Sequence, residues 1–218
     1  MNGAKGNNVL PLFTLAAHGK SRANFTEYHL LAAQNAYESA LKVENSIKET
    51  NSADELKTYI AHVSTCVMCS VAALESKINE YTIDNKDRID KLTITKQYRN
   101  SLNCTTSNQI LNDTCIVDKY ERLWLLACNC ELPENKLKQD IGYLAKLRNA
   151  LTHFTPEWTG ELNKHAKLEK ALNNRFPTSP FYPDPACLFF PYRCLSAGCA
   201  EWSIRTSQDA LRLFPCLR

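Results

Sequence analysis

The chain has 218 residues, 44% hydrophobic and 22% charged, which is long enough for one good hydrophobic core or at most two small ones. Its composition is ordinary for a soluble globular protein, and its low glycine content favours helices. The formal net charge of +3 is too small to indicate nucleic-acid binding by itself.

The N-terminal residues 1–23 are expected to form an irregular arm. Residues 9–17 are the only hydrophobic run that resembles a targeting sequence, but this run is short and is interrupted by Pro11. A secretory signal is therefore not expected. No run approaches the ~20 apolar residues that a membrane span requires. The sequence thus predicts a cytoplasmic protein with no membrane partner.

Two long helices are expected next. The first covers residues 26–48, with one stripe formed by Leu30, Gln34, Tyr37, Leu41 and Ile47. Ser52 and Glu55 then form a capping box, which satisfies backbone donors at the start of the second helix. This second helix has the clearest periodicity in the chain, with apolar residues at spacings of three and four: Leu56, Ile60, Val63, Val67, Val71, Leu74 and Ile78.

Residues 83–112 are polar and of mixed character, with a short helix as an option near 92–98. A third long helix is expected over 115–130. Pro133 suits the first turn of a fourth helix over 134–154, whose apolar residues are Leu137, Ile141, Leu144, Leu147, Leu151 and Phe154. Pro156 disfavours helical geometry at the residue before it, so this helix should stop beside His153.

The last third of the chain is also expected to be mainly helical. A short basic helix covers 161–174, an ordered loop rich in proline and aromatic residues covers 176–191, and a final helix covers 194–214. The inward residues of the final helix are expected to be Leu195, Cys199, Trp202 and Leu213. The pattern indicates no strand and no internal repeat, so the fold class is all-α, an antiparallel helical bundle.

Ten cysteines raise the question of disulfides or a metal site. Cys66 and Cys69 lie three residues apart on an apolar stretch, and Cys128 and Cys130 interrupt another. Neither pair has a second pair at zinc-ribbon spacing. Buried free thiols are therefore favoured, and no metal or other cofactor is expected. A cysteine-dependent redox or metal protein is the alternative.

Arg148 and His153 lie five residues apart at the end of the expected fourth helix. At 100° per residue, Arg148 falls about 40° from Leu144, on the margin of the apolar stripe, whereas His153 falls at about 180°. A guanidinium beside an apolar stripe needs a partner or a cleft. Asn149 precedes His153 by four residues, so its amide could orient the imidazole.

An arginine and a histidine are the smallest set of side chains that can cleave RNA through its own 2′-hydroxyl without a metal. The histidine transfers protons, and the arginine neutralises charge on the phosphate. Arg148 and His153 are about 140° apart on the helix, so one helix does not easily direct both side chains at the same phosphate. A second copy of the helix, related by a two-fold axis, could supply whichever of the two side chains is missing from a site. In the alternative, both residues are simply surface residues at the end of a helix. A second pair, Arg22 and His29, straddles an expected helix start and lacks an apolar frame.

Basic and aromatic residues near this pair are candidates for contacts with RNA. Lys138 and Lys146 share its helix, and Lys164 follows it, although a solvated basic face explains these lysines equally well. Some aromatic residues further along the chain could stack bases, although they more often anchor a proline-rich loop: Tyr182, Phe189, Phe190 and Tyr192.

The chain resembles the HEPN superfamily, all-helical domains with the signature Arg-x4-6-His. Residues 148–153 read Arg-Asn-Ala-Leu-Thr-His, with Asn149 in the polar position that often follows the arginine. Residues 144–147, 154–158 and 70–80 also resemble the corresponding segments of family members. The likeness covers residues 53–158. The expected organisation is an arm over 1–23 and one HEPN-like domain over 24–218, made of a core over 53–158 and a C-terminal helical extension over 159–218.

The resemblance implies a metal-independent endoribonuclease whose active site forms at a homodimer cleft. Arg148 would stabilise the scissile phosphate, His153 would act as acid and base, and Asn149 would support it, giving a 2′,3′-cyclic phosphate and a 5′-hydroxyl. Many relatives are bacterial toxins or antiviral effectors, some held silent by an antitoxin or other regulatory protein. Others keep the fold without catalysis, so a silent dimeric interaction module is the alternative.

Overall fold

The structure is a computed structural model that describes residues 13–15, 21–46, 52–91, 106–112, 115–128, 130–133, 135–156 and 164–214. These residues are predominantly helical, which confirms the all-α class. The arm that was expected to be irregular nevertheless contains a short antiparallel hairpin of β1 (Phe13–Leu15) and β2 (Ser21–Ala23). Strands of three residues are too short to show the alternation by which a strand is recognised in a sequence.

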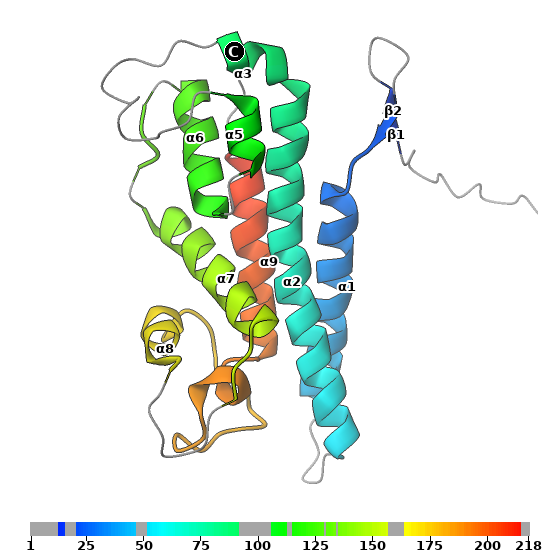
Figure 1. Cartoon of the computed structure of the whole chain (residues 1–218). Helices are drawn as coiled ribbons and strands as arrows, with labels where there is room; N and C mark the ends of the chain where they lie inside the picture. The colour runs from blue at the N-terminus through cyan, green and yellow to red at the C-terminus, as the bar shows by residue number, and fades with distance from the viewer. Residues whose placement is uncertain are drawn as a thin grey trace, which may run out of the picture.

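Helices α1 (Thr26–Asn45) and α2 (Ala53–Asp84) pack side by side (Figure 1). The start of α1 is tied to the last part of α2 by hydrogen bonds. Glu80 accepts from the backbone N–H groups of Phe25 and Thr26 at 2.7 and 3.2 Å, which satisfies donors at the start of α1. Because the start of α1 thus lies near the end of α2, the two helices are antiparallel.

The contact of α1 with α2 uses an alanine face. The buried residues here are Ala33, Ala36 and Ala40, whereas Leu30 and Leu41, which we expected on the buried stripe, are only half-buried. Small side chains let two helix backbones approach closely, and larger side chains then lie at the margins of the contact. The predicted stripe of this helix was therefore wrong for Leu30 and Leu41, because it was centred on the large residues. Tyr37 does pack against the core, and Ile47 lies outside the described residues.

The predicted start and stripe of α2 are confirmed. Ser52 Oγ accepts from the backbone N–H of Glu55 at 3.2 Å, and the Glu55 carboxylate accepts from the backbone N–H of Ser52 at 2.8 Å. The buried apolar stripe contains Val63, Val67, Val71, Leu74 and Ile78. By length and composition α2 could cross a membrane. A core helix meets the same criterion, and α2 contacts α1, α6, α7 and α9.

Helix α9 (Ala197–Arg212) lies in the middle of the bundle, in contact with α1, α2 and α7 (Figure 1). Tyr59 Oη accepts from the N–H of Ala197 at 2.9 Å, and Ser207 Oγ donates to the carbonyl of Ser70 at 2.9 Å. Since these contacts advance in the same direction along both helices, α9 runs parallel to α2.

Helices α9 and α1 belong to the same hydrophobic cluster as α2. Small buried residues on α9 permit its close contact with α2: Ala197, Cys199, Ala200, Ser203, Ser207 and Ala210. Such residues give a weak hydrophobic signal in the sequence, which concealed the central position of this helix. Leu213, which we expected to point inward, is exposed.

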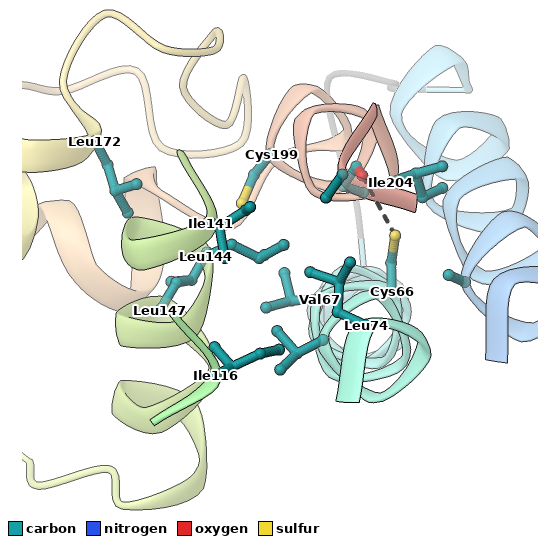
Figure 2. Packing of buried hydrophobic residues seen from close by; sticks show 14 of the residues in the cluster. Cys66, Val67, Leu74, Ile116, Ile141, Leu144, Leu147, Leu172, Cys199 and Ile204 are labelled. Atoms are coloured by element: carbon teal, nitrogen blue, oxygen red, sulfur yellow. Dashed lines mark hydrogen bonds between the residues drawn. The ribbon is translucent and has the colours of Figure 1, made fainter. Parts of the chain in front are cut away.

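The centre of the core is shared by α2, α7 (Lys136–Thr152) and α9. Figure 2 shows side chains from these three helices converging, among them Cys66, Val67 and Leu74 of α2, Ile141, Leu144 and Leu147 of α7, and Cys199 and Ile204 of α9. The stripe of α7 was expected at these positions and is confirmed at its centre. Its last predicted member, Phe154, is 47% exposed and lies beyond the helix.

Three helices pack against the end of α2: α3 (Lys86–Lys91), α5 (Ser107–Asn112) and α6 (Ile116–Cys128) (Figure 1). The third long helix expected over 115–130 corresponds to α6. Helices α3 and α5 lie in the segment that we described only as polar. The start of α5 is fixed by a long-range contact, because Asp90 accepts from the backbone N–H of Ser107 at 2.7 Å. The optional helix at 92–98 lies outside the described residues.

The segment after α7 covers the end of the bundle where that helix terminates (Figure 1). It contains α8 (Ala166–Leu172), which is shorter than the helix expected over 161–174, and a turn over Phe189–Arg193. Phe189 and Phe190 are buried in the main core. The loop expected over 176–191 is therefore anchored by its aromatic residues.

Candidate active site

Arg148 lies where α7 packs on α2. Its Nη2 atom is 2.7 Å from Oε1 of Glu75, and the two side chains are 26% and 35% exposed. Thr152, one turn later on α7, contacts Met68 of α2 at 3.7 Å, so α7 is antiparallel to α2. The sequence predicted that a guanidinium on the margin of the apolar stripe requires a partner, and Glu75 is that partner.

Glu75 is the site residue that the sequence analysis did not identify. It directly follows the buried Leu74, so it lies on the margin of the α2 stripe, as Arg148 lies on the margin of the α7 stripe. Opposite charges at the margins of two stripes that pack on each other will meet if the helices have the right register. The sequence contained this signal, but the register that pairs the two residues depends on the tertiary packing.

His153 ends α7 as its C-cap residue, as predicted from Pro156. Its backbone N–H donates to the carbonyl of Asn149 at 2.9 Å, and its side chain is exposed. Within the part of the chain that the structure describes, the imidazole forms no hydrogen bond, including none with the Asn149 amide. The expected support by that amide is therefore not observed. Both side chains face solvent, where water competes for their hydrogen bonds.

A single chain does not bring Arg148 and His153 together. The arginine is directed to α2 by Glu75, whereas the histidine is exposed at the helix end, about 7.5 Å further along the axis. This arrangement agrees with the 140° separation that the sequence predicted.

Apolar and aromatic side chains lie beside Thr152 and Phe154, the residues that flank His153 in the chain. Met68 and Phe154 are 38% and 47% exposed. The Phe154 ring is parallel to that of His165 within 5°, with 6.4 Å between the ring centres, and Phe190 lies 6.0 Å from Phe154. These rings line a cavity of about 110 Å³, to which Pro156 and Tyr192 also contribute. The end of α7 thus presents an aromatic surface next to the exposed imidazole.

The four aromatic residues proposed for base stacking divide into two groups. Phe189 and Phe190 are buried and contribute to the core. Tyr182 and Tyr192 contact each other, with 5.1 Å between ring centres, and Tyr192 is 42% exposed. Only the tyrosine pair therefore keeps a surface that a base could contact, together with Phe154, which the sequence analysis had assigned to the core.

The three candidate RNA-binding lysines lie in different environments. Lys138 Nζ is 2.5 Å from Glu121 of α6, and this residue precedes Arg148 by ten positions, about 15 Å along the helix. Lys146 is exposed, with its Nζ 5.4 Å from the centre of the Tyr143 ring. Lys164 is exposed and adjoins His165. Lys146 and Lys164 are thus near the aromatic end of α7, whereas Lys138 is not.

The cysteine pairs differ in their surroundings. Cys66 is buried and donates from Sγ to the carbonyl of Ala200 at 3.4 Å (Figure 2), and burial raises the pKa of this thiol. Cys128 and Cys130 are exposed. The cysteines in the described ranges are free thiols, and those ranges contain no group of three or more His, Cys, Asp or Glu that could hold a metal. This supports a packing role for Cys66.

Comparisons with protein-family models, with curated proteins and with solved structures gave no match. The interpretation of the site therefore depends on its geometry and on the residues of the motif.

Proposed function

We propose that the protein is a metal-independent endoribonuclease of HEPN type that acts as a cytoplasmic homodimer. The observation that carries this proposal is the contrast within one motif, in which Glu75 fixes Arg148 while His153 remains exposed and without a partner among the described residues. A fixed guanidinium suits charge stabilisation, and an accessible imidazole suits proton transfer.

The proposed reaction needs only RNA and the protein. The 2′-oxygen attacks the adjacent phosphorus atom while a base removes the 2′-hydroxyl proton. The bond from phosphorus to the 5′-oxygen breaks, and an acid protonates that oxygen, leaving a 2′,3′-cyclic phosphate and a 5′-hydroxyl. A two-fold cleft would contain two copies of His153, one for each proton transfer, and Arg148 would neutralise the additional negative charge on the phosphate.

Dimerisation is proposed because one chain directs the two side chains to different places. Exposed Met68, which contacts Thr152, and exposed Phe154, which follows His153 in the chain, offer apolar surface that a second copy could cover. In such a cleft, Lys146 and Lys164 would contact phosphates, and Phe154 and Tyr192 would stack bases of single-stranded RNA. A role as a bacterial toxin or phage-defence effector, controlled by an antitoxin or other regulatory protein, is part of the same proposal.

The proposal is tested by incubating a mixed RNA pool with the full chain in EDTA and analysing the product ends. Wild type should produce cyclic phosphates, and His153→Ala and Arg148→Ala should each lower the rate by at least about 100-fold. His29→Ala is a matched control, since His29 belongs to the second arginine–histidine pair, and it should cleave normally. Cleavage by His153→Ala at the wild-type rate would contradict the proposal.

A catalytically silent dimeric module is the second candidate. It is favoured by the ion pair of Arg148 with Glu75, because that contact also holds α7 on α2 without any need for a substrate. Under this alternative no variant would have activity to lose, and Arg148→Ala would change only the thermal stability and the dimer affinity. Circular dichroism melts and analytical ultracentrifugation of the same variants separate the two candidates.

A further inference from the structure

A second and larger cavity lies near the opposite end of α7. It is formed by the first two turns of that helix, by residues 175–177 and by α9, and its volume is about 470 Å³. This volume is in the range of sites for small organic molecules. Its closest α7 residue to the motif, Asp140, precedes Arg148 by eight positions and His153 by thirteen, about 12 and about 20 Å along the helix, so the cavity is separate from the candidate active site.

One part of the cavity lining is aromatic. Phe176 and Trp202 both contribute, with 5.4 Å between their ring centres. The indole Nε1 of Trp202 is buried, and no residue that the structure describes accepts a hydrogen bond from it. Indole is only a donor, and a buried donor without an acceptor is costly. Because this nitrogen has no accessible surface, the rings of Phe176 and Trp202 are what the cavity offers to a ligand, and a planar aromatic ring could lie against them.

Another part of the lining is basic. Arg205 and Arg212 lie on α9, and their side chains are 72% and 74% exposed. Among the residues that the structure describes, each forms an ion pair with an acidic residue of its own helix, Glu201 at 4.0 Å and Asp209 at 3.4 Å. Exposed pairs of this kind are weak, so both guanidinium groups can turn to a ligand. Lys136 adds a cation that forms no ion pair within the described ranges.

Two further charged side chains of the lining, Arg175 and Asp140, already have partners. Arg175 forms an ion pair with Asp140, and its guanidinium lies 4.7 Å from the centre of the Tyr143 ring. These side chains are mostly buried and hold the segment after α8 against α7. Glu201 and Asp209 also line the cavity, so Lys136, Arg205 and Arg212 leave it with a small excess of positive charge next to the aromatic wall.

We propose that this cavity binds a small planar aromatic anion. The ring would lie against Phe176 and Trp202, and a phosphate or carboxylate would bind Arg205 and Arg212, whose planar guanidinium groups match both anions. Nucleoside phosphates and aromatic carboxylates share this chemistry. The site is independent of RNA cleavage and would bind its ligand in a catalytically silent protein as well.

Isothermal titration calorimetry of the full chain with AMP and with naphthoate tests this inference and distinguishes the two sources. At least one of the two should bind saturably, while inorganic phosphate and adenosine should bind about tenfold more weakly or not at all, since each provides only half of the contacts. Equal heats for all four probes, or no heat for any of them, would overturn the proposal.

Variants locate the binding. Arg205→Ala combined with Arg212→Ala should weaken binding at least about tenfold, as expected for the loss of charge-assisted contacts. Both side chains are largely exposed, so this variant should fold normally. Trp202→Leu should also weaken binding, and thermal melts will show whether it folds. Lys57→Ala, an exposed cation on α2 outside the cavity, is the control. Unchanged affinity in the double arginine variant would refute the site.

Discussion

The two ends of helix α7 differ in how firmly their polar side chains are held. At its start, Lys138 pairs with Glu121 and Asp140 pairs with Arg175, so the helix is joined to α6 and to the segment after α8. At its end, Arg148 alone has such a partner within the described part of the chain, and Asn149 and His153 are exposed. Side chains that stabilise the fold have fixed partners, whereas an unpaired imidazole beside exposed aromatic rings can engage a substrate without breaking a contact.

The largest expected effect concerns activity. His153→Ala should lower RNA cleavage by at least about 100-fold with an unchanged melting temperature, because it removes the proton-transfer group and no side-chain hydrogen bond to a described residue. Lys138→Ala, at the other end of α7, should keep most of the activity. The measurement is the initial rate on a fluorescent RNA with parallel melting curves. A similar loss of activity in both variants would remove the functional distinction between the two ends.

The next effect concerns stability and should be confined to the start of α7. Asp140→Ala leaves the Arg175 guanidinium without its carboxylate in a mostly buried position, which should lower the free energy of unfolding by about 2–3 kcal/mol, somewhat less than for a fully buried pair. Urea titration followed by circular dichroism measures this. A loss below about 0.5 kcal/mol would show that this end of the helix is not held as the structure indicates.

A smaller effect is expected for the aromatic surface at the end of α7. Phe154→Ala should weaken binding of single-stranded RNA by about 1–2 kcal/mol, the range for one stacked base, and should raise KM more than it lowers kcat. Fluorescence anisotropy with a labelled oligonucleotide provides the affinity. Phe25→Ala is the control, since Phe25 is 49% exposed at the start of α1. If both variants bind RNA alike, Phe154 does not form a base subsite.

The smallest effect is expected for the partner of Arg148. Glu75→Gln keeps an acceptor for the guanidinium and removes only the charge of a partly exposed pair, so stability should fall by no more than about 1 kcal/mol. Cleavage should fall because Arg148 is held less firmly, but less than for His153→Ala. A lower melting temperature with unchanged cleavage would assign the ion pair to the fold alone.

Several features of this protein were determined by short stretches of its sequence. Ser52 and Glu55 fix the start of α2, Pro156 fixes the end of α7 beside His153, and the spacing of large apolar residues fixes the buried faces of both helices. These signals are local because a helix cap or a helix face is defined by residues within one or two turns. They also sufficed to place Arg148 on the margin of the core and His153 outside it.

Other features were decided only by the tertiary structure. The buried faces of α1 and α9 consist mainly of small side chains such as alanine, serine and cysteine, which pack closely but give little hydrophobic contrast in the sequence. The sequence therefore did not reveal that α9 occupies the centre of the bundle. Arg148 meets Glu75 across 73 positions of the chain, and that pairing depends on the register of α7 on α2. Close packing sets this register, because a helix interface accepts only those alignments in which side chains of both helices interdigitate.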